Sequence, residues 1–496
     1  MLNLCVVLLM KSIFIYLLLI VGVFNVFCSC TDDDDFSTST SDLLTFSMDT
    51  VRLDTVFSTV TSSTRSFWIH NNSGRSIRCT NVRLENGNQS GFRVNVSAAS
   101  LGPSNGYQVG NIEVRKGDSA RVFVKITSPK GNRTEPKHIT DNIVFMLESG
   151  VQQKVNLDAF SWDAVFLKNL VVSNDTTIAS GQPIVVYGKM VVGKDATLTI
   201  TPGTTMYFHA DAGIDVEGRL LCKGTAEKGI VLRGDRLDNM FDYLPYDYVS
   251  GQWQGVRIKE GSYSNVVSFT DLHGSFDGLR VDSSDVSREK LDISNTTIHN
   301  CQGTALYVEN SKVNIANCQL SNSLGSCLHV DGGDVRVNNC TLAQFYPFDS
   351  SRGSALRFSG IDHPLKSFVC TNTLVTGYSA DELTGEKPSG DNPNEFNFDF
   401  SHCVLRTPPV ETDDSVHFVS VEFESPEDTT VAGTKNFVKI DTEKLRYDFH
   451  LQSTSAAVDK ADPATSAPAD REGFLRDGKP DIGAYEYREE EKPKEE

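Results

Sequence analysis

The sequence predicts an all-β protein in which an antiparallel domain precedes a long coil of stacked parallel strands. Helix signals are weak, and residues typical of strands and turns (Val, Ile, Thr, Phe, Asn and Gly) dominate the composition. The strongest observation is a short phrase of one polar or aromatic residue between two apolar ones, preceded by a small residue. Its copies are Val256–Ile258, Leu279–Val281, Leu306–Val308, Leu328–Val330 and Leu356–Phe358, at intervals of 23, 27, 22 and 28 residues.

The phrase predicts which side chains face the interior. In a strand the first and third residues share one face and the middle residue lies on the other. The apolar residues are therefore expected inside, and the middle residues outside. Intervals this short leave no room for a crossover helix, so successive turns of the chain are expected to stack in parallel.

A longer repeat sets the period of the coil. The hexapeptides that begin at Ile293, Ile315 and Val337 correspond at all six positions, at a spacing of 22 residues. Their third residues are Asn295, Asn317 and Asn339, which we expect in one column. A buried amide needs partners for its carbonyl and its NH2 group, so we predict that these side chains bond to one another along a ladder.

This pattern resembles the right-handed, single-stranded parallel β-helix of the pectate-lyase type. We place that coil at residues 163–446. The resemblance concerns architecture and implies no particular reaction. Trp253, just before the first phrase, is expected to pack at a corner of the coil rather than to bind sugar.

The N-terminus resembles a bacterial lipoprotein export signal. Lys11 precedes an apolar run at 13–27, and Met10 offers a second possible start within the predicted signal peptide 1–30. The segment Phe27–Cys30 resembles a lipobox, which implies that Cys30 carries the lipid. The acidic run that follows resembles the surface-export signal of lipoproteins in the Bacteroides group, which implies an outer-membrane protein that faces the exterior. A plain transmembrane anchor is the alternative.

Two segments separate the predicted anchor from the coil. Residues 31–45 are rich in acidic, Ser and Thr residues and predict a tether. Residues 46–162 alternate in about seven short strands separated by turn signals, which is typical of an immunoglobulin-like β-sandwich. The sequence lacks the Cys–Trp–Cys pattern of antibody domains. We expect a spacer.

Charge and cysteine usage limit the partners. The formal net charge of −19 argues against a nucleic-acid partner. The 11 cysteines form no CxxC pair and no Cys/His metal spacing, so no metal site is predicted. Cys318 and Cys340 occupy equivalent positions about 4.8 Å apart, but their parallel side chains favour packing thiols over a disulfide.

The middle residues of the five phrases form the candidate binding site. They are Arg257, Arg280, Tyr307, His329 and Arg357. As a stack they would span about 19 Å. Arginine binds carboxylate or sulfate with two parallel hydrogen bonds, and a tyrosine ring can stack on a sugar. We therefore predict that this stripe binds an acidic glycan, with a merely solvated strand face as the alternative.

Catalysis is the second functional hypothesis, in the form of a polysaccharide lyase or a glycosidase. For a lyase, Arg280 would be the base and Asp277 or Asp282 would hold Ca²⁺, the one cofactor considered. No hydrolase-type carboxylate pair stands out, and His273 and His299 are expected to be structural. We favour a surface lipoprotein that binds a glycan or another cell-surface component through the outward face of the coil, without predicted catalytic activity. A purely structural surface protein is the third hypothesis. The oligomeric state is not predicted.

Two further segments interrupt or follow the coil. The aromatic and acidic residues 240–248 could stack on sugar rings or cover a turn of the coil. Residues 447–487 end in the string Asp481–Glu486, which resembles the C-terminal module of secreted bacterial β-helix proteins. We expect this module to cap the last turn, with Asp481 and Glu486 serving that role. Residues 488–496 are highly charged and are expected to be disordered.

Overall fold

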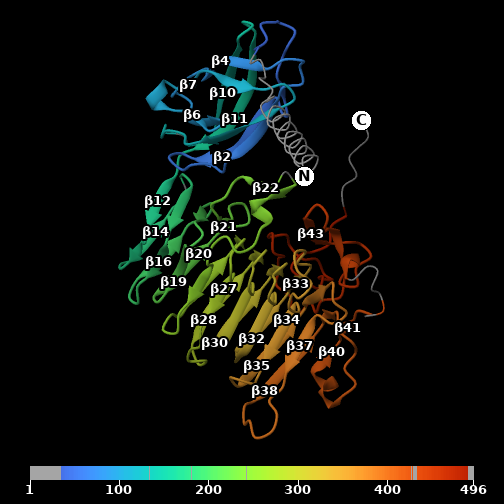
Figure 1. Cartoon of the computed structure of the whole chain (residues 1–496). Coiled ribbons are helices and arrows are strands. Elements are labelled where there is room, and N and C mark those ends of the chain that lie inside the picture. The colour runs from blue at the N-terminus through green and yellow to red at the C-terminus, as the bar shows by residue number, and fades with distance from the viewer. Residues whose placement is uncertain are drawn as a thin grey trace, which may run out of the picture. The chain divides into compact units, whose positions relative to one another are not determined.

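The computed structural model describes residues 35–132, 134–179, 181–241, 243–425, 427 and 433–489. The predicted signal peptide, with Met10 and Cys30, lies outside the described residues, as do the acidic residues up to 34 and the tail from 490. No helix within the described ranges is long and apolar enough to cross a membrane. The chain divides into two compact units, which we describe separately (Figure 1).

The first unit consists of short antiparallel strands in two sheets. One sheet has the order β1-β3-β9-β5-β6; the other has the order β2-β11-β10-β4-β7, with β8 also paired to β4. Alternate residues of a strand are apolar and buried, such as Val122 and Val124 of β9. The rings of Phe46 and Phe145, one from each sheet, lie 5.2 Å apart between centroids. The strands are β1 (Thr45–Phe46), β2 (Thr50–Phe57), β3 (Arg65–His70), β4 (Ile77–Leu84), β5 (Phe92–Val96), β6 (Ala99–Leu101), β7 (Gln108–Val109), β8 (Ile112–Val114), β9 (Ser119–Ile126), β10 (Lys137–Leu147) and β11 (Gln152–Trp162), with a short 3-10 helix at Pro103–Asn105.

The second unit is a parallel coil with three rows of strands, which we call faces A, B and C. Face A is an eleven-stranded sheet made of β12 (Val165–Lys168), β15 (Ile184–Tyr187), β18 (Thr205–Phe208), β21 (Ile230–Gly234), β26 (Thr270–His273), β29 (Thr297–His299), β31 (Gln319–Ser321), β33 (Thr341–Gln344), β36 (Leu374–Gly377), β39 (Val404–Leu405) and β41 (Glu422–Phe423). Successive turns stack along the coil (Figure 1).

Faces B and C are joined, because the long strands β30 (Leu306–Ala316) and β32 (Leu328–Asn338) run through both. Face B contains in addition β13 (Val171–Val172), β16 (Lys189–Val192), β19 (Gly213–Val216), β24 (Val256–Ile258), β27 (Leu279–Val281), β34 (Leu356–Ser359) and β37 (Leu383–Glu386). Face C contains β14 (Thr176–Ile178), β17 (Thr197–Ile200), β20 (Arg219–Lys223), β25 (Asn265–Ser268), β28 (Glu289–Ser294), β35 (Leu365–Thr371), β38 (Phe396–Ser401) and β40 (Phe418–Val419).

Smaller elements flank the coil. Two antiparallel pairs are β22 (Asn239–Phe241) with β23 (Leu244–Pro245), and β42 (Phe437–Asp441) with β43 (Arg446–Leu451). Short 3-10 helices lie at Tyr246–Tyr248, Asp413–His417 and Thr434–Asn436.

The register of face B follows the recurring phrase, which confirms the prediction of a parallel β-helix. The first residues of the five phrases pair in sequence, and so do the middle and the third residues. The apolar residues are buried in the core of the coil. The small residue before the phrase is required by close backbone packing: a Cβ on Gly255 (φ +88°) would lie 1.8 Å from the carbonyl oxygen of Asp277, and one on Gly278 would lie 2.2 Å from that of Ala305.

Buried residues at the corners of the coil support the same packing. Trp253 is fully buried, stacks on Phe208 with ring centroids 4.2 Å apart, and donates from Nε1 to the carbonyl oxygen of His273 at 2.9 Å. It therefore packs at a corner. Cys318 and Cys340 are both buried and not disulfide-bonded.

The structure places the three predicted ladder asparagines at equivalent corners between faces C and A. Their φ angles of 50°, 51° and 49° lie in the left-handed region that asparagine tolerates. The Nδ2 atoms of Asn295 and Asn317 donate to the carbonyl oxygens of Asp470 and Ala469, each at 2.9 Å, and Asn339 accepts from the backbone of Ala467 at 2.9 Å. The expected amide-to-amide ladder is replaced by bonds to a distant segment, because that segment lies along the corner and offers backbone partners.

That segment belongs to the C-terminal module predicted at 447–487. Its part from residue 457 onward, which we call the C-terminal module below, lies along face A. The backbone of Gly483 donates to Asn372 and that of Ala484 donates to Thr341 Oγ1, at 2.9 and 3.0 Å. Ile482 and Ala484 join an apolar cluster with outward residues of face A. The module therefore crosses the side of several turns, and the expectation that it caps the last turn is corrected: its apolar residues are matched by apolar side chains on face A.

The two carboxylates at the end of the module hold its own loops. Asp481 is buried and accepts from the backbone of Asp459 at 2.7 Å. Glu486 is buried too, and its Oε2 lies 3.0 Å from Nη1 of Arg476. These contacts give both residues a structural role within the module.

Candidate functional site

The predicted stripe lies on the outer side of face B, with its five residues in register. Each of its arginines already contacts a carboxylate. The pairs are Arg257–Asp282 at 2.9 Å, Arg280–Glu309 at 3.3 Å and Arg357–Glu386 at 2.8 Å. The stripe is therefore an alternation of paired charges, and an acidic ligand would have to displace these carboxylates.

The aromatic members of the stripe also contact neighbours. The guanidinium of Arg280 lies 4.3 Å from the ring centroid of Tyr307, and Tyr307 meets His329 edge to face at 4.8 Å. Burial, aided by the charge of Arg357, lowers the pKa of His329 to about 4. His329 is therefore a neutral ring at pH 7.

The residues expected to serve a lyase have different partners. Asp282 lies between Arg257 and Arg280, and its Oδ1 is 3.4 Å from Nε of Arg280. Asp277 instead accepts from the backbone of Thr304 at 3.2 Å. A guanidinium held between carboxylates keeps its proton, so Arg280 is poorly placed as a base, and the structure does not bring Asp277 and Asp282 to one ion.

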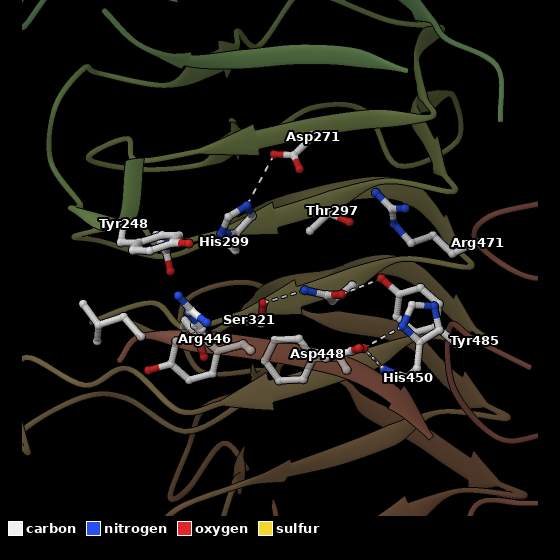
Figure 2. Close-up of a pocket in the computed structure, with 16 residues that line it drawn as sticks. Tyr248, Asp271, Thr297, His299, Ser321, Arg446, Asp448, His450, Arg471 and Tyr485 are labelled. Carbon is white, nitrogen blue, oxygen red and sulfur yellow. Dashed lines mark hydrogen bonds and ion pairs between the residues drawn. The ribbon is translucent and has the colours of Figure 1, made fainter. Parts of the chain in front are cut away.

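A pocket on face A was not predicted from the sequence. It has a volume of about 660 Å³. One wall is the outer side of face A, and the others come from Tyr248, from β43 with the preceding Leu445, and from the C-terminal module (Figure 2). The lining residues are Tyr248, Asp271, Thr297, His299, Asn300, Gln319, Ser321, Asn322, Leu445, Arg446, Tyr447, Asp448, Phe449, His450, Arg471 and Tyr485.

The polar wall of the pocket is formed by side chains that are in register on adjacent strands of face A. Asp271, Thr297 and Gln319 are in register on β26, β29 and β31, and so are His273, His299 and Ser321. The residues between them, Leu272, Ile298 and Leu320, belong to the core. Two outward columns of polar side chains therefore stand next to each other on face A.

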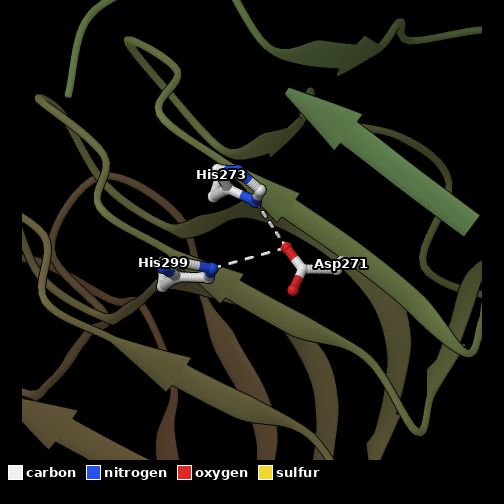
Figure 3. Close-up of side chains that lie close together, drawn as sticks. All are labelled: Asp271, His273 and His299. Carbon is white, nitrogen blue, oxygen red and sulfur yellow. Dashed lines mark hydrogen bonds and ion pairs between the residues drawn. The ribbon is translucent and has the colours of Figure 1, made fainter. Parts of the chain in front are cut away.

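Asp271, His273 and His299 form a compact cluster at one end of this wall (Figure 3). Oδ1 of Asp271 is 2.6 Å from Nδ1 of His273 and 3.4 Å from Nε2 of His299. The two imidazoles stack with centroids 4.8 Å apart. Nε2 of His273 is 2.9 Å from Oδ1 of Asp247, which itself lies 2.8 Å from Nη1 of Arg233.

The electrostatics of the cluster follow from these distances. Burial opposes the charged form of His273, but the carboxylates of Asp271 and Asp247 outweigh it and raise the pKa of His273 to about 9. Burial likewise opposes ionisation of Asp271, yet the two imidazoles hold its pKa well below the usual range. In a protein without a bound ion, His273 is thus an imidazolium between two carboxylates at neutral pH.

The cluster also offers one nitrogen or oxygen ligand atom from each residue, all within 4.8 Å of one another. These are donors that could hold a metal ion, whereas no metal spacing was visible in the sequence. A signal existed: Ser268–His273 and Ser294–His299 correspond in position at a spacing of 26 residues, which stacks the two histidines.

The remaining walls are mainly aromatic and basic, with Asp448 as the one carboxylate among their lining residues. Tyr447 and Phe449 lie with ring planes 6° apart, and the ring of Tyr485 is 4.4 Å from that of His450. Arg446 and Arg471 lie at opposite ends of the pocket (Figure 2). Within the described ranges, neither guanidinium has an ion-pair partner, in contrast to the arginines of the stripe.

Residues 240–248 lie partly at the pocket and partly on the exposed surface. Tyr248 lines the pocket, and Asp247 contacts His273. Phe241 and Tyr243 are 52% and 73% exposed and stack on each other at 5.7 Å.

Comparison with known proteins supports the fold. Residues 229–360 match the family described as right-handed β-helix region, which adds the handedness. No curated protein matches the sequence.

Among solved structures, the chain is similar to three glycan-active enzymes. Pectate lyase Pel9A is 12% identical over 66% of this chain and 88% of its own, with a TM-score of 0.29. The catalytic domain of a GH87 α-1,3-glucanase, solved with tetrasaccharides, is 9% identical over 73% and 91%, with a TM-score of 0.22. A family 123 glycoside hydrolase from Clostridium perfringens is 13% identical over 24% of this chain and 25% of its own, with a TM-score of 0.17. At such low TM-scores these likenesses carry no functional argument.

Proposed function

We propose that the protein binds an acidic oligosaccharide in the pocket on face A. The observation that carries this proposal is the pair of arginines, Arg446 and Arg471, that line an aromatic pocket without a carboxylate partner among the described residues. An unpaired guanidinium can bind a carboxylate or sulfate of the ligand with two parallel hydrogen bonds. Its neighbours supply rings for a sugar face and amides for hydroxyl groups.

The size of the pocket fits this class of ligand. Its volume of about 660 Å³ lies within the range of about 300–1,000 Å³ of small-ligand sites. The amide side chains on the floor are Gln319, Asn300 and Asn322. An amide presents both a donor and an acceptor, which matches the hydroxyl groups of a sugar ring. The stripe on face B is a weaker candidate, because its arginines would have to exchange one carboxylate for another.

An affinity assay separates the two surfaces. The protein is run on gels containing uronate or sulfated polysaccharides, and its retention is compared with that of variants. We expect Arg446→Ala and Arg471→Ala to weaken retention on at least one acidic glycan, while Arg257→Ala and Arg357→Ala leave it unchanged. Loss of retention in the stripe variants alone would move the site to face B. If the unaltered protein is retained on no glycan, the proposal is wrong and the hypothesis of a purely structural surface protein remains.

Cleavage of the glycan is a second candidate function. It is favoured by two histidine–carboxylate contacts in the pocket, Asp271 with His299 at 3.4 Å and Asp448 with His450 at 2.6 Å. Such pairs can exchange a proton with a reacting group. Incubation with the retained glycan, followed by ultraviolet absorbance for an unsaturated product and by reducing-end assay for hydrolysis, decides between binding and cleavage.

We also propose that the protein is a lipoprotein anchored at Cys30 in the outer membrane, facing outward, with an immunoglobulin-like spacer before the coil. The lipobox-like segment, the acidic run beside it and the strand pattern of 46–162 support this proposal. Metabolic labelling with a radioactive fatty acid should be lost in Cys30→Ala. Protease added to intact cells should remove the coil; complete protection would contradict outward exposure.

A further inference from the structure

The cluster on face A has a donor set that fits a transition metal. One carboxylate and two imidazoles, from Asp271, His273 and His299, present ligand atoms within 4.8 Å of one another. Imidazole nitrogen suits Zn²⁺ and its first-row neighbours, whereas Ca²⁺ and Mg²⁺ prefer sites built of oxygen. We propose that these three residues bind a divalent ion of the Zn²⁺ class, with an open coordination position toward the pocket.

The distances are close to those that such an ion requires. Tetrahedral bonds of about 2.0–2.1 Å place neighbouring ligand atoms about 3.3 Å apart. The separation of Nε2 of His299 from Oδ1 of Asp271 is 3.4 Å, which already fits. Nδ1 of His273 is 2.6 Å from the same oxygen, because a hydrogen bond joins them. A small rotation of the Asp271 carboxylate, whose side chain is 36% exposed, opens this gap when the metal replaces the proton.

The surroundings hold the ligands in place. The histidines stand in register on adjacent strands, β26 and β29, so their backbone separation is fixed. Asp247 accepts from Nε2 of His273 at 2.9 Å, which leaves Nδ1 to face the ion. Arg233 pairs with Asp247 at 2.8 Å. A carboxylate behind a ligating histidine fixes the ring's orientation and makes it a better ligand.

The position of the cluster determines what the ion would meet. Asp271 and His299 line the pocket, while the side chain of His273 is only 9% exposed. An ion held by these three residues is therefore reached from the pocket side. Three protein ligands leave a fourth position for water or for an oxygen of a ligand. The metal would add a third cationic contact, beside Arg446 and Arg471, for an acidic group in the pocket.

Calorimetric titration of tag-free, EDTA-treated protein with ZnCl₂ tests the proposal. We expect one ion per chain, loss of that binding in His299→Ala and Asp271→Asn, and a weakening of roughly 10–100-fold in Asp247→Asn. His209→Ala is the matched control, because His209 pairs with Asp235 at 2.8 Å but, among the residues that the structure describes, belongs to no group of three possible metal ligands. Circular dichroism establishes that each variant is folded.

Cobalt identifies the donors. Bound Co²⁺ should show d–d absorption in the visible range without the sulfur-to-cobalt charge-transfer band that a cysteine ligand would cause. Absence of stoichiometric Zn²⁺ binding, equal binding by folded His299→Ala, or Ca²⁺ binding as tight as that of Zn²⁺ would each overturn the proposal.

Metal binding and glycan binding can fail separately. Retention on acidic glycans without any Zn²⁺ binding would overturn the metal site and leave the glycan site standing. Stoichiometric Zn²⁺ binding by a protein that is retained on no glycan would overturn the glycan site and leave the metal site standing.

Discussion

Replacement of Arg476 by alanine tests how the C-terminal module is held against face A. The side chain of Arg476 is 2% exposed. Its guanidinium donates to Glu486 at 3.0 Å, to the carbonyl oxygens of Asp481 and Gly483 at 3.1 and 2.8 Å, and to Asn317 of the coil at 3.3 Å. Removing one partner of a buried ion pair costs about 3–5 kcal/mol, because the other charge stays buried and unpaired.

The cost should appear as local opening of the module. At about 1.4 kcal/mol per factor of ten, the population with the module detached rises roughly 10²- to 10⁴-fold. Hydrogen exchange measures this directly, because the amides of Gly483 and Ala484 donate to Asn372 and Thr341 of the coil and are bonded only while the module is docked. We expect their exchange to accelerate by that factor while amides of face A strands do not change.

Arg257→Ala is the control for loss of a charge. Arg257 is 48% exposed and pairs with Asp282 at the surface, where such a pair contributes at most about 1 kcal/mol. Unchanged exchange at Gly483 and Ala484 in Arg476→Ala, or an equal acceleration throughout the coil, would refute the reasoning. The first result would mean that the apolar contacts alone hold the module, and the second that the module and the coil unfold together.

Three further changes test the coil. Gly255→Ala should cost about 3 kcal/mol or more in urea unfolding, because its Cβ meets backbone at positive φ; Gly261→Ala, with open space around it, should cost little, and equal costs would contradict the packing. Burial raises the pKa of Glu382 from 4.5 to about 7, so its stabilising contribution is complete below about pH 4.5, falls by about 3 kcal/mol as the pH rises to 7, and is lost above. The free energy of unfolding of Glu382→Gln should not show this decline between pH 4.5 and 7. If it falls with pH as steeply as that of the parent protein, Glu382 is not the group responsible. Trp253→Phe leaves the carbonyl oxygen of His273 without its donor and should cost about 1–3 kcal/mol; an unchanged urea midpoint would show that water replaces the indole.

The coil could be predicted because the same sequence motif recurs in successive turns. Each phrase repeats the apolar-polar-apolar order, and a slip of one residue would expose Leu279 or Leu306 to water, so the register is strongly specified. The small residues at positions such as Gly255 and Gly278 repeat for the same reason, since each turn must approach the next. Periodicity carries no information about segments that do not repeat.

The C-terminal module is such a segment. Asn295 and Asp470 bond across 175 residues of chain. From the sequence, a column of asparagines had no visible partner except itself, which explains why a ladder was expected. The asparagines instead have a left-handed backbone at these corners, and the side chains of Asn295 and Asn317 donate to carbonyl oxygens of the C-terminal module.

The candidate site could not be predicted from the 22-residue repeat, because its two histidines are separated by a different number of residues. His273 and His299 are 26 residues apart, whereas the matching hexapeptides repeat at 22. The extra residues lie in the loop between β27 and β28, which lengthens one turn without disturbing face A. The stripe on face B was visible because it repeats with the phrase, but its carboxylate partners, such as Glu386 beside Arg357, come from neighbouring turns whose alignment was not used.

The side-on position of the C-terminal module imposes an order of assembly. Turns of a coil can wind one after another as the chain emerges, but residues 457–487 find their partners only after the turns that carry Asn295, Asn317, Asn339 and Asn372 are complete. Until then the pocket lacks Arg471 and Tyr485, the two lining residues that this segment contributes. A chain that stops before residue 457 would keep β43 but lack these two residues of the pocket, so ligand binding that depends on Arg471 would begin only once the C-terminal module has docked.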